Sequence, residues 1–250
     1  MFFGFDLKEI LMFPFKDEES RKHLLIGGLV SIAAFFIPIL PYFFLLGYAV
    51  IIARQVLKGE QPHMVPWEDW GGMFKDGAKL FGVRIIYSLP ILIFAVPLMI
   101  GGMAMPFIAG NMDSGNADTL FALFSVLMVG SMCIIIPLSI PLVVIIPASE
   151  MHVIEKNDFT AAFQFKEWWP VLRANLGGFI VAFGIYYVVS FALMIVIQII
   201  AATFILACLM IVLIPAMTIY MTLIMYATSA IAYRDGKVKL SQSELTPQTL

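Results

Sequence analysis

Residues 174–233 have the sequence ANLGGFIVAFGIYYVVSFALMIVIQIIAATFILACLMIVLIPAMTIYMTLIMYATSAIAY, which contains no Asp, Glu, Lys or Arg. A helix that crosses a lipid bilayer needs about 20 apolar residues. This stretch is therefore long enough for two crossings joined by a turn. Neither Gly nor Pro lies near its middle, and we place the turn in the region Gln198–Thr203.

The rest of the 250-residue chain has the same character. Hydrophobic residues make up 61% and charged residues only 13%, against roughly 25% in a typical soluble domain. Three further uncharged runs cover Leu24–Ala53, Ile85–Met112 and Thr119–Ser149. This pattern predicts an all-α, multi-pass integral membrane protein and excludes a soluble enzyme. A net charge of −2 argues against a nucleic-acid partner, and two cysteines exclude a secreted disulfide scaffold.

The first uncharged run differs from the others because Pro38 and Pro41 interrupt it. Its arms, Leu24–Ile37 and Tyr42–Ala53, would be roughly 21 and 18 Å long at 1.5 Å per residue. Neither arm crosses a hydrocarbon core of about 30 Å. We therefore expect a re-entrant N-terminal hairpin followed by four transmembrane helices. A single spanning helix is the alternative.

The basic residues favour the re-entrant hairpin. All 15 Lys and Arg lie in the segments Met1–His23, Arg54–Arg84, His152–Arg173 and Arg234–Leu250. Basic residues near membrane helices stay in the cytoplasm. A re-entrant hairpin puts all 15 on that side, with both termini cytoplasmic, in the cytoplasmic membrane. A spanning helix would move four of them, Lys8, Lys16, Arg21 and Lys22, to the outside.

A short motif occurs three times, as Phe15-Lys16-Asp17, Phe74-Lys75-Asp76 and Phe165-Lys166-Glu167. Each copy precedes further basic residues and an apolar run, which indicates an amphipathic interfacial helix leading into a membrane hairpin. The alternative is that interfaces simply favour aromatic and basic residues. We divide the chain into 1–53 (interfacial helix and re-entrant hairpin), 54–150 (loop, interfacial helix and first hairpin), 151–233 (second interfacial helix and hairpin) and 234–250 (cytoplasmic tail).

The segment Gly59–Arg84 carries the densest set of distinctive residues. Its two tryptophans suit the lipid headgroup layer, Asp69 can cap a following helix, and from Met73 an in-plane amphipathic helix is expected. The residues that we select as a candidate interface or functional loop are Trp67, Asp69, Trp70, Gly71, Gly72, Phe74, Asp76 and Gly77.

The same segment resembles the signature of a known family. The sequence Pro66–Gly77, PWEDWGGMFKDG, is similar to the loop P-x-F/W-x-D-W-G/A/E-x-L/M-F-x-D-G of an uncharacterised family of bacterial and archaeal multi-pass membrane proteins. That family is defined only as a domain of unknown function. The resemblance is specific over Gly59–Pro90 and extends to about Asp6–Tyr233. It implies an integral membrane location and brings no activity.

Chemically active residues are sparse in the predicted spans, which contain no charged side chain. Gln198 is their strongest polar group, and we expect Glu150 to lie at the membrane edge. The pair His152 and Glu155 could share a helix face, but a metal site would need more ligands. We predict no catalytic residue, cofactor or metal site. Pro97 and Pro141 are candidate positions for breaks in the membrane helices.

Three functions are compatible with this pattern. The first is a non-catalytic membrane subunit or scaffold that contacts membrane lipids and either a partner membrane protein or further copies of itself. The second is a channel or permease for a small neutral or amphipathic solute, built on Pro-broken helices. The third is a lipid-active membrane enzyme that uses Asp69, Asp76 or His152.

Overall fold

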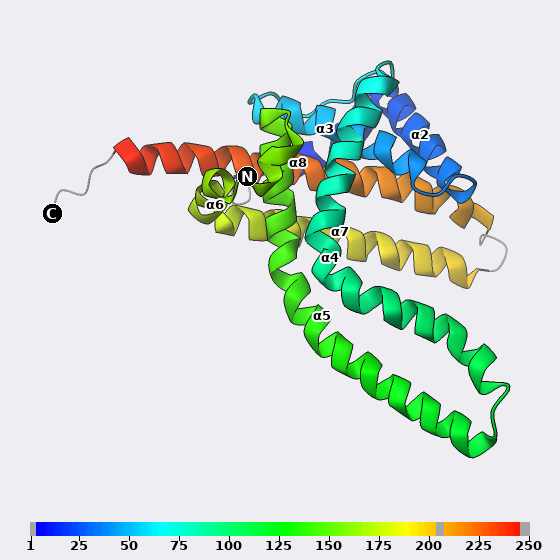
Figure 1. The fold of residues 1–250 in the computed structure, drawn as a ribbon. Helices are drawn as coiled ribbons and strands as arrows, with labels where there is room; N and C mark the ends of the chain where they lie inside the picture. The colour runs from blue at the N-terminus through cyan, green and yellow to red at the C-terminus, as the bar shows by residue number, and fades with distance from the viewer. Residues whose placement is uncertain (1–3, 204–207, 246–250) are drawn as a thin grey trace. The chain divides into compact units, whose positions relative to one another are not determined.

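The computed structural model describes residues 4–203 and 208–245, which are mostly helical and contain no β-strand (Figure 1). Five helices are long and apolar enough to cross a membrane, which supports the predicted all-α, multi-pass fold. These are α3 (Leu40–Leu57), α4 (Trp70–Ala109), α5 (Ser114–Lys156), α7 (Leu176–Ala202) and α8 (Met210–Leu245). The shorter elements are α1 (Leu7–Met12), η1 (Phe13–Phe15), α2 (Glu18–Ile32), η2 (Ala33–Phe35), η3 (Phe159–Phe163) and α6 (Phe165–Ala174).

The chain forms two compact units. The larger combines Met1–Val83 with Pro147–Leu250, and the smaller is the helical hairpin Arg84–Ile146. Helices α4 and α5 each contribute to both units. The four segments predicted from the sequence follow the order of the chain, whereas these units group residues by contact.

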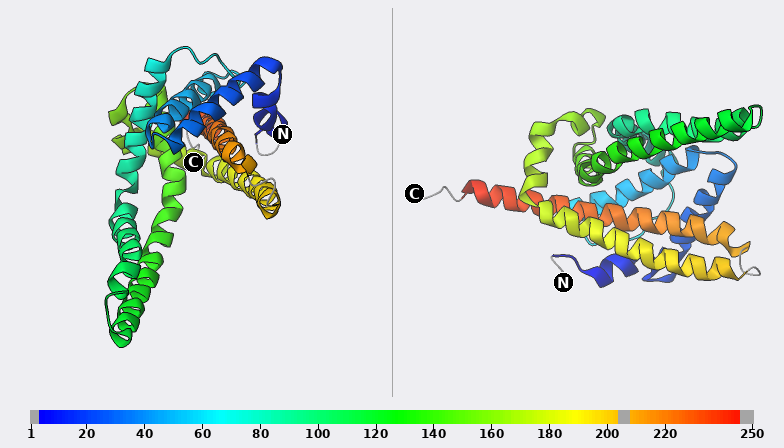
Figure 2. Two further views of the ribbon diagram at one scale, coloured as in Figure 1. Left: turned by 90° about the vertical axis from the view of Figure 1, so that its right-hand side faces the viewer. Right: turned by 90° about the horizontal axis from the view of Figure 1, so that it is seen from below.

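Helix α8 is the centre of the larger unit, where α2, α3, α6 and α7 pack against it. Figure 2 shows α7 and α8 lying side by side along most of their length. The packed faces of α8 combine large apolar residues with alanines, which allow close helix approach. Its buried residues include Ile219, Leu223, Ile224, Tyr226, Ala227, Ala230 and Tyr233.

Helices α2 and α3 form the N-terminal hairpin. α2 ends at Ile32, before the two prolines, and α3 begins at Leu40 with Pro41 in its first turn, where proline costs no hydrogen bond. Ile39 makes the bend with a φ of 76°, a conformation that β-branched residues rarely adopt. The helical arms are therefore longer than the predicted 14 and 12 residues, because both extend into the flanking charged segments.

One predicted interfacial helix is not a separate element. Instead of a separate helix beginning near Met73, α4 runs from Trp70 to Ala109 without interruption and continues through Pro90, Pro97 and Pro106. The third copy of the motif does begin a separate short helix, α6. Asn175 ends α6, donates to the Ala232 carbonyl (2.8 Å) and accepts from Lys239 Nζ (2.6 Å), so the break is held against α8.

The C-terminal part of the chain also differs from the prediction. The expected tail from residue 234 is helical as far as Leu245, because α8 continues beyond Tyr233. Gly236 permits this extension to pack on α6, since a Cβ there would lie 2.6 Å from the Val171 carbonyl oxygen. α7 ends at Ala202, inside the region predicted for the turn, and residues 204–207 lie outside the described part.

The smaller unit consists of the adjoining parts of α4 and α5, which lie side by side in both views (Figure 2). The Phe124 ring packs against the small residues Gly101 and Gly102 of the opposite arm. Pro97 and Pro141, the predicted helix breaks, lie inside α4 and α5, and both helices continue through them. Each proline thus removes one backbone hydrogen bond without ending its helix.

Two glycines fix the crossing of α3 with the first turns of α4. A Cβ on Gly47 would overlap the Met73 carbonyl, and one on Gly77 would overlap the Phe43 carbonyl. The two backbones are therefore in direct contact at this crossing. This explains Gly77, the last residue of the motif-bearing loop, as a packing residue.

We predict that Gly77→Ala destabilises the protein by about 1–3 kcal/mol, because the added methyl group must push two helix backbones apart. The measurement is the thermal unfolding midpoint of the detergent-solubilised protein. Gly184→Ala is the matched control, since nothing lies within 4 Å of a Cβ at that helical position. Equal midpoints for the two variants would contradict the close crossing.

Candidate functional site at the ends of α3, α4 and α5

The loop between α3 and α4 is fastened to the N-terminal hairpin by two aromatic residues, Tyr48 of α3 and Trp67 of the loop. The Tyr48 hydroxyl donates to the Val65 carbonyl (2.8 Å) and accepts from the Val65 amide (2.9 Å). The Trp67 ring stacks on Tyr48 with centroids 4.1 Å apart, and its indole Nε1 donates to the His23 carbonyl (3.0 Å). The loop is thus held by contacts with both α2 and α3.

This arrangement corrects one expectation for the tryptophans. Trp67 was predicted to lie in the headgroup layer, but only 7% of it is exposed, because it is held between Tyr48 and α2. Trp70, at the start of α4, is 40% exposed and packs edge-on against Phe44. Phe74 contacts Phe44 as well, so Trp70 and Phe74 of α4 both pack against this residue of α3.

Asp69 caps α4, as the sequence predicts. Its carboxylate accepts from the Gly72 amide (2.8 Å), one of the donors left unpaired at a helix start. A side chain at Gly72 would collide with that carboxylate, whereas the space around Gly71 is open. Gly72 is therefore needed for the cap, and the structure gives no such reason for Gly71.

Asp76 joins α3 to α4 and to the end of α5. Its carboxylate pairs with Arg54 Nη1 (2.7 Å) and Lys79 Nζ (3.3 Å). Both cations also contact Asn157, whose side-chain oxygen lies 3.1 Å from Arg54 Nη2 and 2.9 Å from Lys79 Nζ. Asn157 has a φ of 55°, a left-handed conformation that Asn tolerates. All four residues are thus held in one network.

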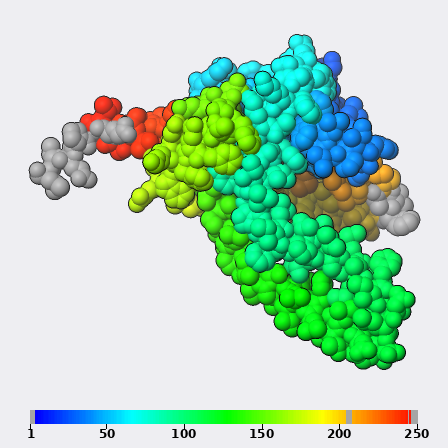
Figure 3. Space-filling model, viewed as in Figure 1, coloured from blue at the N-terminus to red at the C-terminus, as the bar shows by residue number. Residues whose placement is uncertain are grey.

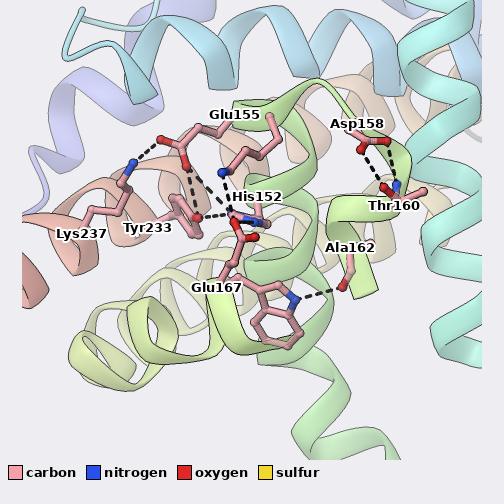
Figure 4. Close-up of polar contacts among 10 residues, drawn as sticks. His152, Glu155, Asp158, Thr160, Ala162, Glu167, Tyr233 and Lys237 are labelled. Atoms are coloured by element: carbon pink, nitrogen blue, oxygen red, sulfur yellow. Dashed lines mark hydrogen bonds and ion pairs between the residues drawn. The ribbon is translucent and has the colours of Figure 1, made fainter. Parts of the chain in front are cut away.

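A second polar cluster links α5, α6 and α8 (Figure 4). His152 is buried, with Nδ1 2.7 Å from the Tyr233 hydroxyl and Nε2 3.4 Å from Glu167. The same hydroxyl lies 3.3 Å from Glu155, which forms an ion pair with Lys237. His152 therefore lies in a packed network with residues of α6 and α8.

Neighbouring charges and hydrogen bonds lower the pKa of two carboxyl groups near these clusters. The hydrogen bond from Lys156 holds the pKa of Glu167 below its ordinary value. Hydrogen bonds from Thr160, whose hydroxyl lies 2.6 Å away, do the same for Asp158. Both groups are therefore negatively charged at neutral pH.

Glu150 is another departure from the expected arrangement. It was predicted to lie at the membrane edge. In the structure its side chain is fully buried within the larger unit, on the last turns of α5. Within residues 4–203 and 208–245, no three His, Cys, Asp or Glu side chains come close enough to hold a metal ion.

The candidate loop residues gather around α3, which the sequence analysis treated only as an arm of the hairpin. The residues it missed are Gly47, Tyr48 and Arg54 on α3 and Asn157 after α5. Tyr48 and Gly47 had a visible signal, since they are a polar aromatic residue and a glycine within an apolar run. Asn157 had none, because its role depends on a contact between distant segments.

We predict that Tyr48→Phe frees the loop from α3, because the variant loses both hydrogen bonds to Val65 while keeping the ring. Hydrogen–deuterium exchange at residues 61–67 should become faster. Tyr42→Phe, at an exposed tyrosine of the same helix, is the control and should leave the exchange rate unchanged. Equal protection in both variants would contradict a fastened loop.

Comparison with known proteins gives one match. A family model described as "Protein of unknown function (DUF4013)" matches residues 30–202, which include α3, the loop and the aspartate network. No curated protein and no solved structure matches the chain. Because the model covers more than half of the sequence, the chain belongs to the DUF4013 family of proteins of unknown function.

Proposed function

We propose that this chain is a non-catalytic subunit or scaffold of the cytoplasmic membrane. In this proposal the larger unit is the structural base, and the hairpin Arg84–Ile146 packs against a partner membrane protein or a second copy of the chain. Both termini lie in the cytoplasm, and membrane lipids contact the remaining helix faces.

The observation that carries the proposal is how few residues of the hairpin Arg84–Ile146 are buried. Among the described residues of Arg84–Ile146, Met105 alone is buried. In the most apolar 18-residue windows of α4 and α5, 6% and 0% of the residues are buried. The surface of this hairpin can be followed in green in Figure 3. Helices in a membrane associate through van der Waals packing, and the hairpin parts of these two helices have exposed apolar surface available for it.

The contacts of the N-terminal hairpin support its re-entrant placement. α2 has 15 residues and is therefore only roughly 22 Å long, short of a core of about 30 Å. The far end of α3 receives a hydrogen bond from Arg234 of α8 to the Val56 carbonyl (3.4 Å). Gly4 lies beside Asp235, next to the same residue of α8. The chain before α2 and the last turn of α3 thus both approach α8 at Arg234 and Asp235, where the charged part of α8 begins.

The exposed bend of the hairpin supports the same placement. Phe35, Phe36, Ile37 and Ile39 are all exposed, which suits contact with lipid tails at the tip. Close to this bend, Ser31 and Tyr42 line a small pocket with Pro215, near the opposite end of α8. The N-terminal hairpin therefore has its charged ends beside Arg234 and Asp235 of α8 and its apolar bend near Pro215, in the first turns of α8.

The residues that a lipid-active enzyme would use have structural partners in this fold. Asp69 caps α4, Asp76 pairs with Arg54, and His152 contacts Tyr233. These structural roles explain why the three residues are present without assuming that they catalyse a reaction. We therefore prefer the subunit proposal.

Cysteine cross-linking in native membranes tests the packing of the hairpin. Cys133 lies exposed on α5 inside the hairpin, and Cys208 lies outside it. With Cys208→Ser, a thiol-specific cross-linker should join Cys133 to one defined neighbour, which mass spectrometry identifies as a partner or a second copy. The reciprocal variant, Cys133→Ser, is the control and should give no such product. A hairpin that cross-links to nothing while the protein remains monomeric would overturn the proposal.

A further inference from the structure

An open pocket of about 490 Å³ lies where the end of α3, the first turns of α4 and the end of α5 meet. Its size falls within the roughly 300–1,000 Å³ of small-molecule sites. Four of its lining residues are cations, namely Arg54, Lys58, Lys75 and Lys79. Only two carboxylates, Asp76 and Glu155, line it with them, so the pocket carries a net positive charge.

Two of the four cations are held in place. Arg54 and Lys79 share the Asp76 carboxylate, and Asn157 contacts both of them. The other carboxylate, Glu155, is already paired with Lys237 of α8. The acidic groups of the pocket are thus committed to existing ion pairs.

The remaining two cations have no such partner. Within the described part of the chain, neither Lys58 nor Lys75 makes an ion pair or a side-chain hydrogen bond. Both are exposed at the pocket. Four cations gathered in one pocket repel one another, and an anion placed among them relieves that repulsion.

The position of the pocket indicates the class of anion. Arg54 is the first charged residue after the uncharged run Leu24–Ala53, and Asn157 follows closely after the run Thr119–Ser149. The pocket therefore lies where charged segments meet apolar helices, which in a bilayer is the depth of the lipid phosphates. Basic pockets between helices at this depth bind anionic headgroups, and Arg and Lys bind phosphate oxygens through charge-assisted hydrogen bonds.

We propose that this pocket binds a phosphate-bearing anion, either the phosphodiester of an anionic phospholipid or a soluble phosphate ester. Arg54 and Lys79 form the fixed floor of the site, and Lys58 and Lys75 close on the phosphate from the rim. The inference rests on the proposed membrane location but not on the subunit role. The binding experiment described below and the cross-linking experiment on the subunit role can therefore give negative results independently of each other.

The test measures binding of phosphatidylglycerol to the purified full-length protein in detergent by native mass spectrometry, with phosphatidylcholine as the zwitterionic comparison. The protein should prefer phosphatidylglycerol. The variant Lys58→Gln/Lys75→Gln should bind it on the order of 30-fold more weakly, as expected for two lysines at an anionic headgroup. Lys58→Arg/Lys75→Arg, which keeps both charges, should retain binding.

The matched control is Lys8→Gln/Lys166→Gln, which removes two exposed lysines outside the pocket and should leave binding unchanged. Inorganic phosphate distinguishes the two sources. If it binds alone and depends on Lys58 and Lys75, the ligand is a soluble phosphate ester; if only the lipid binds, the ligand is a headgroup. Equal binding of either probe to the two Gln double variants, or no binding of either probe, would overturn the proposal.

Discussion

The packing of α8 is the interaction on which the larger unit depends. Helices α2, α3, α6 and α7 pack against this one, and its buried alanines let them approach closely. At Gly236 the α8 backbone reaches the Val171 carbonyl of α6, and the Asn175 side chain joins the break between α6 and α7 to the same part of α8. Small side chains at contacts between helices favour association in a membrane, where lipid removes most of the hydrophobic driving force. The apolar residues of this helix therefore serve packing within the chain, in a helix that is also long and apolar enough to cross a membrane.

The charged residues at one end of this assembly are organised and not merely solvated. Asp76 joins α3, α4 and the chain after α5, and His152 lies in a network that reaches α6 and α8. Glu155 belongs to that network and also lines the basic pocket. The two polar clusters are thus neighbours in the larger unit. We infer that this region combines a structural role with the binding of an anion at the membrane surface.

The sequence predicted the helical class, the uncharged runs and the cap at Asp69, because these depend on composition and on local hydrogen bonding. It did not reveal that Trp67 is buried, or that the helix expected from Met73 begins at Trp70 and runs on to Ala109 as one element. The stacking of Trp67 on Tyr48 and the contact of Gly77 with Phe43 depend on tertiary packing between segments. No local pattern encodes that packing. The arms of the hairpin were predicted too short because the charged residues beside them are also helical.

The re-entrant placement of the N-terminal hairpin is the central claim, and single-cysteine labelling in sealed inverted membrane vesicles tests it most directly. The variants Lys8→Cys, Lys75→Cys and Gly115→Cys are made in a background with Cys133→Ser and Cys208→Ser. A membrane-impermeant maleimide added outside such vesicles reaches only the cytoplasmic face. We predict that the cysteines at positions 8 and 75 react and that the one at 115 does not. A cysteine at position 8 that is protected together with that at 115, while 75 reacts, would show that the first hairpin spans the membrane.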